Sequence, residues 1–192
     1  MTSDDLRERI VDAADSLYYA KGYAAVGMDE LRSAAGVSLR RLYSVFASKD
    51  EIVLAVLDRR HQMWEDGVAE RVGRVEDPRE KLLAVYDYLA DWFCDDEFRG
   101  CGFINAFGEL GGTNPAVAQA VREHKASFQR FVAGLVEAAG ASPALAAQLA
   151  ILAEGAQTTA AISGDPAVAA QARGAAEVLV AAAGAAADPR AA

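Results

Sequence analysis

Residues 24–52 decide how this chain is interpreted, and they read AAVGMDELRSAAGVSLRRLYSVFASKDEI. The pattern predicts two short helices, because Gly36 is suited to end the first and Ser38 to cap the second. From residue 31 to residue 49 there is no Asp or Glu, and four side chains are basic: Arg32, Arg40, Arg41 and Lys49. A protein that must meet a polyanion has to concentrate its cations locally, so the segment is interpreted as a DNA-docking surface.

The rest of the composition makes this segment stand out, because the 192 residues carry a formal net charge of −9. Residues 1–60 hold nine Lys or Arg and ten Asp or Glu, whereas residues 61–192 hold ten and eighteen. The acidic remainder would repel DNA, so only the amino-terminal part is expected to dock. A hydrophobic content of 53% is ample for a folded core and excludes disorder over most of the length.

No targeting, membrane or metal signal is found in the sequence. Charged residues follow the initial Met almost at once, and charges interrupt the Ala-rich region 151–187, so a soluble cytoplasmic protein is expected. Cys94 and Cys101 fit no metal template, and neither a metal nor a cofactor is predicted. We interpret both as small apolar side chains in a reducing compartment, with a redox switch between them as the minor alternative.

Apolar residues recur at intervals of three and four almost everywhere, which predicts an all-α protein of about nine helices. Ser48 and Asp77 are expected to cap two of them. The helices are expected at about 4–21, 28–36, 39–46, 48–74, 78–93, 101–112 and 115–140, with two more after Ser142-Pro143 and Asp165-Pro166.

The predicted domains are a three-helix, helix-turn-helix DNA-binding domain at 1–48, a helical effector-binding and dimerisation domain at 49–184, and a disordered tail at 185–192. The last two helices carry more apolar surface than two peripheral helices need, which favours a homodimer built through them. The apolar residues concerned are Leu145, Leu149, Leu152, Ile162, Val168, Val178 and Leu179.

Several spaced motifs in the first 60 residues share one register. They are Gly22-Tyr23, Ala35-Gly36-Val37-Ser38, Leu42-Tyr43, Phe46 and Ser48-Lys49-Asp50. With these motifs, the segment from about residue 4 to 60 resembles the amino-terminal domain of the TetR family of transcriptional repressors. Beyond it, only the succession of helices agrees.

The resemblance implies that Tyr43 and Lys49 bind phosphate and that Ser38 caps the recognition helix. Positions 39 to 41 and 44 then carry specificity. Arg40 and Arg41 are the candidates for base readout, because a bidentate Arg to guanine is the commonest specific contact, although either could instead pair with a phosphate or a neighbouring acid. The predicted DNA-binding residues are Ser38, Leu39, Arg40, Arg41, Tyr43, Ser44 and Lys49.

The segment also departs from the family pattern. Many members have a small residue and a Thr where this chain has Arg40-Arg41, and a Ser or Thr cap where it has Gly27. Glycine can cap a helix but offers no hydroxyl to a phosphate. That phosphate contact is therefore not expected, and the operator sequence cannot be taken from relatives.

The resemblance further implies a small-molecule effector bound in the carboxyl-terminal domain. An aromatic set with a few polar groups is the candidate pocket, which suggests an apolar or aromatic effector, although a packed core would also explain the aromatic residues. Asn105 and Glu109 lie four residues apart on one helix face, and His124 is expected at a helix surface. The candidate residues are Tyr86, Trp92, Phe93, Phe103, Asn105, Phe107, Glu109 and Phe128.

The expected function is that of a ligand-responsive repressor that binds an inverted-repeat operator as a dimer. Activation by the same domain stays open. An enzyme is not expected, because the chain has no Gly-rich phosphate loop and no Ser or Cys with an evident His base. The alternative is a helical interaction adaptor that has lost DNA binding. The basic segment argues against it, because an adaptor has no reason to keep a group of cations on a solvent-facing surface.

Overall fold

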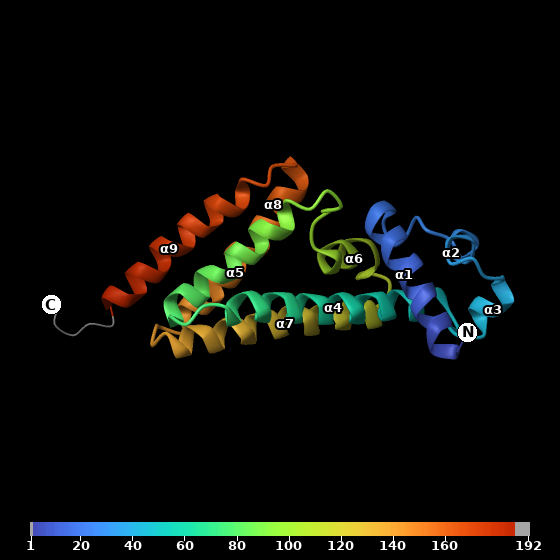
Figure 1. Ribbon diagram of the computed structural model, residues 1–192, viewed down its shortest axis with the longest axis horizontal. Helices are drawn as coiled ribbons and strands as arrows, with labels where there is room; N and C mark the ends of the chain where they lie inside the picture. Colours follow the sequence, from blue (N-terminus) through green and yellow to red (C-terminus); the bar gives the residue numbers. More distant parts are fainter. Residues whose placement is uncertain (1, 187–192) are drawn as a thin grey trace. The chain divides into compact units, whose positions relative to one another are not determined.

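The computed structural model describes residues 2–186, and its regular structure over that range consists of nine α helices without a strand (Figure 1). The prediction of an all-α fold is confirmed. The helices are α1 (Ser3–Lys21), α2 (Met28–Ala34), α3 (Leu39–Tyr43), α4 (Lys49–Gly73), α5 (Pro78–Phe93), α6 (Gly102–Leu110), α7 (Pro115–Ala138), α8 (Ala144–Ser163) and α9 (Val168–Ala186). The predicted tail begins within α9, and its residues 187–192 lie outside the described part.

The described residues form two compact units. Unit 1 comprises the chain up to Met63 together with Cys101–His124, and unit 2 comprises Trp64–Gly100 and the chain from Lys125 onward. Helices α4 and α7 each contribute to both units. The domain boundaries predicted at 48 and 184 refer to DNA and effector binding rather than to packing, and they remain predictions.

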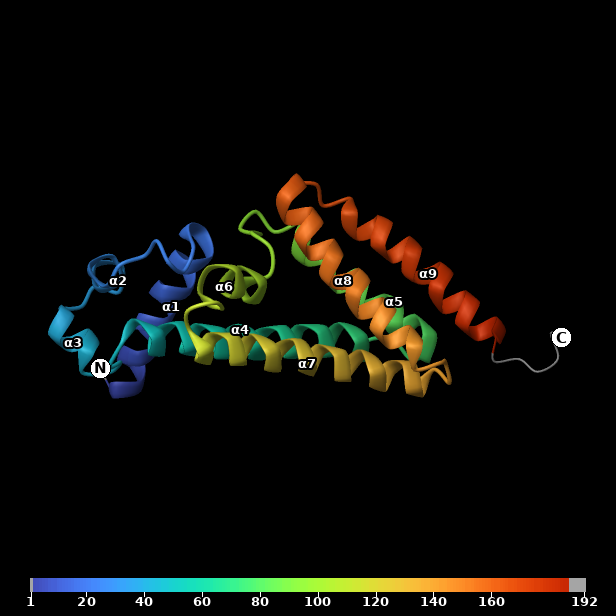
Figure 2. The same cartoon turned by 180° about the vertical axis from the view of Figure 1, so that it is seen from behind.

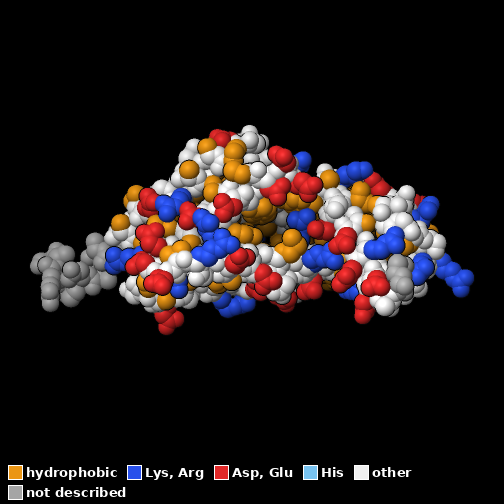
Figure 3. Space-filling model, in the orientation of Figure 1, with side chains coloured by type: hydrophobic (Ala, Val, Ile, Leu, Met, Phe, Trp, Pro, Cys, Tyr) orange, Lys and Arg blue, Asp and Glu red, His pale blue; other side chains and the backbone are white. Residues whose placement is uncertain are grey.

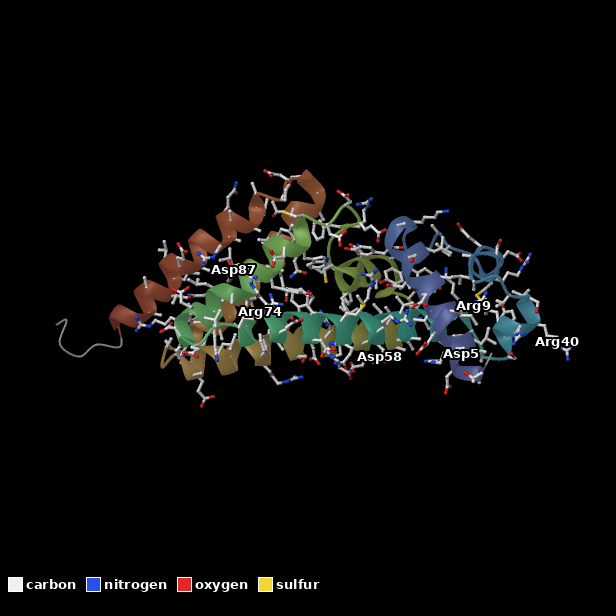
Figure 4. The ribbon with its side chains drawn as sticks, viewed as in Figure 1. Asp5, Arg9, Arg40, Asp58, Arg74 and Asp87 are labelled. Carbon is white, nitrogen blue, oxygen red and sulfur yellow. The ribbon has the colours of Figure 1, made fainter. Side chains whose placement is uncertain are left out.

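Helix α1 organises unit 1. The hydroxyl of Thr2 accepts from the backbone N–H of Asp5 at 3.1 Å, and the Asp5 carboxylate accepts from the N–H of Thr2 at 2.8 Å, a capping box that starts the helix (Figure 4). Its apolar face is buried, and α1 packs on α2, which packs on α3. The helix ends at Gly22, whose φ of +93° suits a residue without a Cβ.

Helix α3 is shorter than predicted. It was expected to reach residue 46, but it ends at Tyr43, after which the Ser44 hydroxyl donates to the carbonyl of Arg41 at 2.7 Å. Hydroxyl side chains that bond nearby carbonyls compete with regular helix geometry, and a turn follows. Leu42 on the helix and Phe46 just beyond its end are both buried.

Unit 2 is built around α5, α8 and α9, which pack on one another (Figure 2). Asp77 caps α5 as predicted, by accepting from the N–H groups of Arg79 and Glu80 at 2.9 and 3.0 Å. Helix α5 contributes bulky Leu, Val and aromatic side chains to the core, whereas α8 and α9 contribute mainly alanines, whose small size permits close helix contact. Across the described residues, no helix is both long enough and apolar enough to cross a membrane.

Candidate nucleic-acid interface

The position of α3 in unit 1 depends on one apolar anchor and on polar caps. Leu42 is fully buried, while the remaining side chains of this five-residue helix are exposed. The Ser38 hydroxyl accepts from the N–H of Arg41 at 3.2 Å, so the predicted N-cap is confirmed. Because one face is fixed and the ends are capped, the opposite face of α3 is presented to solvent in a defined orientation.

The exposed face of α3 carries most of the predicted DNA-binding side chains. Tyr43 is 47% and Leu39 38% exposed, and Ser38, Arg40, Arg41 and Ser44 are exposed as well. Arg40 projects away from the ribbon, and Lys and Arg side chains protrude at this end of unit 1 (Figures 3 and 4). In the part of the chain that the structure describes, neither Arg40 nor Arg41 forms an ion pair. Their charge is therefore available to an external anion.

Arg32 differs from these two arginines although it lies in the same acid-free segment. Its Nε donates to the carboxylate of Asp29, three residues earlier on α2, at 2.8 Å. The pair lies one helical turn apart, at a spacing where opposite charges attract. The cationic character of the segment is consequently concentrated on α3 and at the start of α4.

Lys49, the first residue of α4, contacts the turn between α1 and α2 within unit 1. Its ammonium donates to the carbonyl of Ala24 at 3.3 Å and lies 5.9 Å from the centre of the Tyr18 ring. Partial burial lowers the pKa of Lys49, and the charges of Asp50 and Glu109 act in the opposite direction. An ammonium has three N–H donors, so the one bonded to Ala24 leaves others for an external acceptor.

Glu109 was predicted for the effector pocket, and the structure places its carboxylate at the turn between α1 and α2. It accepts from the backbone N–H of Ala24 at 2.7 Å. A Cβ added at Gly22 would come within 3.0 Å of both carboxylate oxygens, so the glycine allows α6 to approach this turn closely. Ala24 is therefore bonded on both sides, at its N–H by Glu109 and at its carbonyl by Lys49.

The other predicted effector residues of unit 1 lie on α6 as well. Phe103 is buried and stacks on His124, with ring centres 3.5 Å apart and planes inclined by 2°. Asn105 is half-buried and Phe107 is 47% exposed. Within unit 1, Phe103 thus lies in a core cluster, while Phe107 faces solvent.

The histidines were not identified as partners from the sequence. His124 was expected at a helix surface, but it is only 5% exposed, and its Nδ1 lies 3.0 Å from the Nδ1 of His61. The two residues are 63 positions apart, so no local pattern indicates the contact. It arises because α4 and α7 bring these helix faces together around Phe103.

The four predicted effector residues of unit 2 belong mainly to its core. The Tyr86 hydroxyl donates to the carbonyl of Leu149 at 2.8 Å, and Phe128 packs against Trp64 at 5.6 Å between ring centres. Trp92 and Phe93 both contact Phe98, which the sequence did not single out. A pocket of about 200 Å³ is lined by Phe93, Asp95, Phe98, Arg99, Ala160, Ala161, Gly164 and Pro166.

Helix α2, the turn that follows it and the capped, exposed helix α3 form the helix-turn-helix arrangement found in DNA-binding transcriptional regulators. Two family models match the chain. The model described as "Bacterial regulatory proteins, tetR family" covers residues 10–56, and the one described as "Tetracyclin repressor-like, C-terminal domain" covers residues 78–176. The chain belongs to the TetR family, as its amino-terminal motifs predicted.

Curated relatives include both an activator and a repressor of transcription. The chain is 35% identical over 119 residues to the HTH-type transcriptional activator FasR of Mycolicibacterium smegmatis, covering 62% of this chain and 53% of that protein. It is 28% identical over 111 residues to the HTH-type transcriptional repressor NemR of Escherichia coli, covering 57% and 56%. The aligned part thus spans little more than half the length of these relatives.

Solved structures match over nearly the whole chain. A TetR-family transcriptional regulator from Streptomyces coelicolor has 28% identity and a TM-score of 0.86, covering 94% of this chain and 96% of that chain. A putative TetR transcriptional regulator from Streptomyces avermitilis has 30% identity and a TM-score of 0.81, with coverage of 93% and 98%. These matches extend the likeness in fold well beyond the amino-terminal segment.

Proposed function

We propose that this transcriptional regulator is a ligand-responsive repressor that binds an inverted-repeat operator as a homodimer. The observation that carries the proposal is the exposed face of α3, where Arg40 and Arg41 lie without carboxylate partners in the described chain. In a protein with a net charge of −9, two guanidinium groups kept free on a capped helix fit a polyanionic partner.

The proposed docking places α3 in the major groove. Arg40 and Arg41 read base edges there, and Leu39 and Ser44 add specificity. The Tyr43 hydroxyl and the Lys49 ammonium bind phosphates, which fix the register of the protein without reading sequence. Ser38 serves mainly by capping α3, since its hydroxyl already accepts from the Arg41 N–H.

The homodimer is proposed to form through α8 and α9. Two of the seven apolar residues that suggested this surface, Leu145 and Leu149, are buried within the chain's own core and do not support it. Stronger support comes from Ile151, Ile162 and Val178, which are 71%, 83% and 70% exposed on these two helices. A two-fold axis would pair this surface with itself and remove these side chains from water.

Effector binding is proposed for the aromatic residues of the carboxyl-terminal domain. The pocket beside Phe93 and Phe98 offers apolar walls together with Asp95 and Arg99. A ligand acts on DNA binding only if its affinity differs between the two states of the dimer, and about 1 to 3 kcal/mol of coupling is typical. We propose that the protein represses transcription, although the relatives include both an activator and a repressor. Expression of a reporter gene placed downstream of the selected site would distinguish repression from activation.

The experiment that tests the proposal is selection of duplex DNA from a random pool by the purified protein, with binding measured again at two salt concentrations. Enrichment of a palindrome supports a dimeric regulator with a defined operator. If protein freed of any co-purified ligand enriches no motif, and its binding is weak and strongly salt-dependent, the DNA-reading proposal is wrong and the adaptor alternative replaces it. The same result with ligand still bound would instead be that of a released repressor.

A further inference from the structure

Two residues that the sequence assigned to different tasks meet on one backbone residue. Lys49 was predicted to bind phosphate and Glu109 to bind an effector, yet both bond to Ala24 in the turn between α1 and α2. The two contacts join segments 85 and 25 residues apart in sequence, and all three residues belong to unit 1. The turn is thus tied on one side to α6 and on the other to the start of α4.

The arrangement restrains the Lys49 ammonium beside the turn. A lysine on a flexible stem loses much rotamer freedom when it binds, so a lysine already held by a carbonyl needs less ordering on contact with DNA. The Ala24 carbonyl provides that hold at 3.3 Å, and its own position depends on how firmly the turn is fixed. The bond from the Ala24 N–H to the Glu109 carboxylate, at 2.7 Å, fixes the turn.

We propose that Glu109 is a positioning residue for DNA binding, which holds Ala24 so that its carbonyl orients the Lys49 ammonium toward a DNA phosphate. The inference rests on the proposed function and adds a route by which it is regulated. Glu109 lies on the nine-residue helix α6 with Phe103, Asn105 and Phe107, which the sequence assigned to the effector. The pocket beside Phe93 and Phe98 contains no residue of α6, so the proposed regulation is by a ligand that contacts α6 itself, displaces it, and withdraws the carboxylate from Ala24.

Two close substitutions separate this role from a simple effect of charge. Glu109→Gln loses the negative charge but keeps an oxygen that accepts from the Ala24 N–H, whereas Glu109→Ala loses both. If Glu109 acted only as a negative charge near the lysine and the DNA, both variants would bind DNA more tightly and by similar factors. If it acts by holding Ala24, only Glu109→Ala binds more weakly.

The experiment measures affinity for the palindrome selected above at several salt concentrations. We expect Glu109→Ala to raise Kd about five- to tenfold, which corresponds to the loss of about one ordinary hydrogen bond. It should also lower the slope of log K against log salt by about 0.9, the value for one phosphate. We expect Glu109→Gln to stay within about twofold of wild type. Glu123→Ala is the matched control, since Glu123 is an exposed carboxylate of unit 1 on α7.

The double variant tests whether Glu109 acts through Lys49. Lys49→Ala removes the ammonium, so adding Glu109→Ala to it should change neither Kd nor the salt slope further. Full additivity of the two effects would overturn the inference, as would equal binding by wild type and Glu109→Ala, or tighter binding by both Glu109 variants.

A measurement without DNA keeps the inference separate from the proposed function. Hydrogen exchange of the Ala24 amide should be faster in Glu109→Ala than in wild type and unchanged in Glu123→Ala, with similar thermal unfolding of all three proteins. Unchanged exchange in Glu109→Ala would overturn the inference. If the wild-type protein selects no DNA sequence, both the proposed function and the role assigned to Glu109 are wrong. If the wild-type protein and Glu109→Ala bind the selected sequence equally well, only the role assigned to Glu109 is wrong.

Discussion

The two arginines of α3 and three arginines of unit 2 have the same side chain in opposite situations. In unit 2 the Arg173 Nε donates to Asp87 at 2.7 Å, Arg71 lies 3.4 Å from Asp91, and Arg74 lies 2.5 Å from Glu70 (Figure 4). On α3, Arg40 and Arg41 have no carboxylate partner among the described residues. In a chain with 28 acids and 19 bases, two adjacent guanidinium groups without a carboxylate partner on an exposed helix face are available to an external anion.

The two regions also differ in what holds them in place. Helix α8 buries five alanines, two leucines and Gln157 along its length, whereas α3 buries only Leu42 and relies on the Ser38 cap. A helix that presents its side chains to a partner has little surface left for packing. Its position therefore depends on few contacts, and single substitutions there should have large effects.

The largest expected effect tests this dependence on one anchor. Leu42→Ala should lower the free energy of unfolding of the amino-terminal unit by about 2–5 kcal/mol, because it removes a fully buried side chain and leaves a cavity. Chemical denaturation followed by circular dichroism would measure the loss. Leu39→Ala, on the exposed face, is the control for stability only and should change it by less than about 0.5 kcal/mol. Equal stability of the two variants would show that the caps alone position α3.

The next effect tests the unpaired arginines. Arg40→Ala or Arg41→Ala should cost about 1–3 kcal/mol of discrimination at one base position, because a bidentate contact to guanine is lost. Selection from the random DNA pool, repeated with each variant, would show which position becomes degenerate. Thermal unfolding should not change, since neither side chain is packed or paired. If both variants weaken every sequence equally, the two arginines bind phosphate and the assignment of readout is wrong.

A smaller, uniform effect is expected for the phosphate contacts. Tyr43→Phe should weaken all DNA sequences alike by about 1 kcal/mol, because it removes a hydroxyl donor from a ring that is 47% exposed. Titrations with the selected palindrome and with a scrambled duplex would measure both affinities. A loss confined to the palindrome would place Tyr43 among the residues that read bases.

The smallest effect is expected in unit 2. Arg173→Ala should lower the free energy of unfolding by no more than about 1 kcal/mol, because its pairs with Asp87 and Glu177 are partly exposed and screened by solvent. The bond to Asp87 raises the pKa of Arg173, so the guanidinium stays charged at any working pH. DNA binding should not change. A loss of affinity in Arg173→Ala would remove the contrast between paired and unpaired arginines.

The sequence predicted what depends on near neighbours in the chain. Ser38 and Ser48 cap their helices as expected, with bonds of 3.2 Å to N–H groups three residues ahead. Asp77 caps α5 as expected, and the family follows from amino-terminal motifs in one register. The predicted end of α3 lies three residues too far along the chain. The Ser44 hydroxyl donates to the carbonyl of Arg41, and such a side-chain bond is not visible in the apolar periodicity used to predict helix ends.

The amino-acid sequence by itself determined the all-α class, the helix starts, the family and the acid-free segment with its cations. The helical class rests on the spacing of apolar side chains, and the helix starts rest on hydrogen bonds between residues three or four positions apart. Both depend only on residues that are near neighbours in the sequence. Only the tertiary structure decided that His61 meets His124 and that Glu109 and Lys49 meet on Ala24. Such contacts join residues 25 to 85 positions apart, and they depend on which helix faces pack together, which a single sequence does not specify.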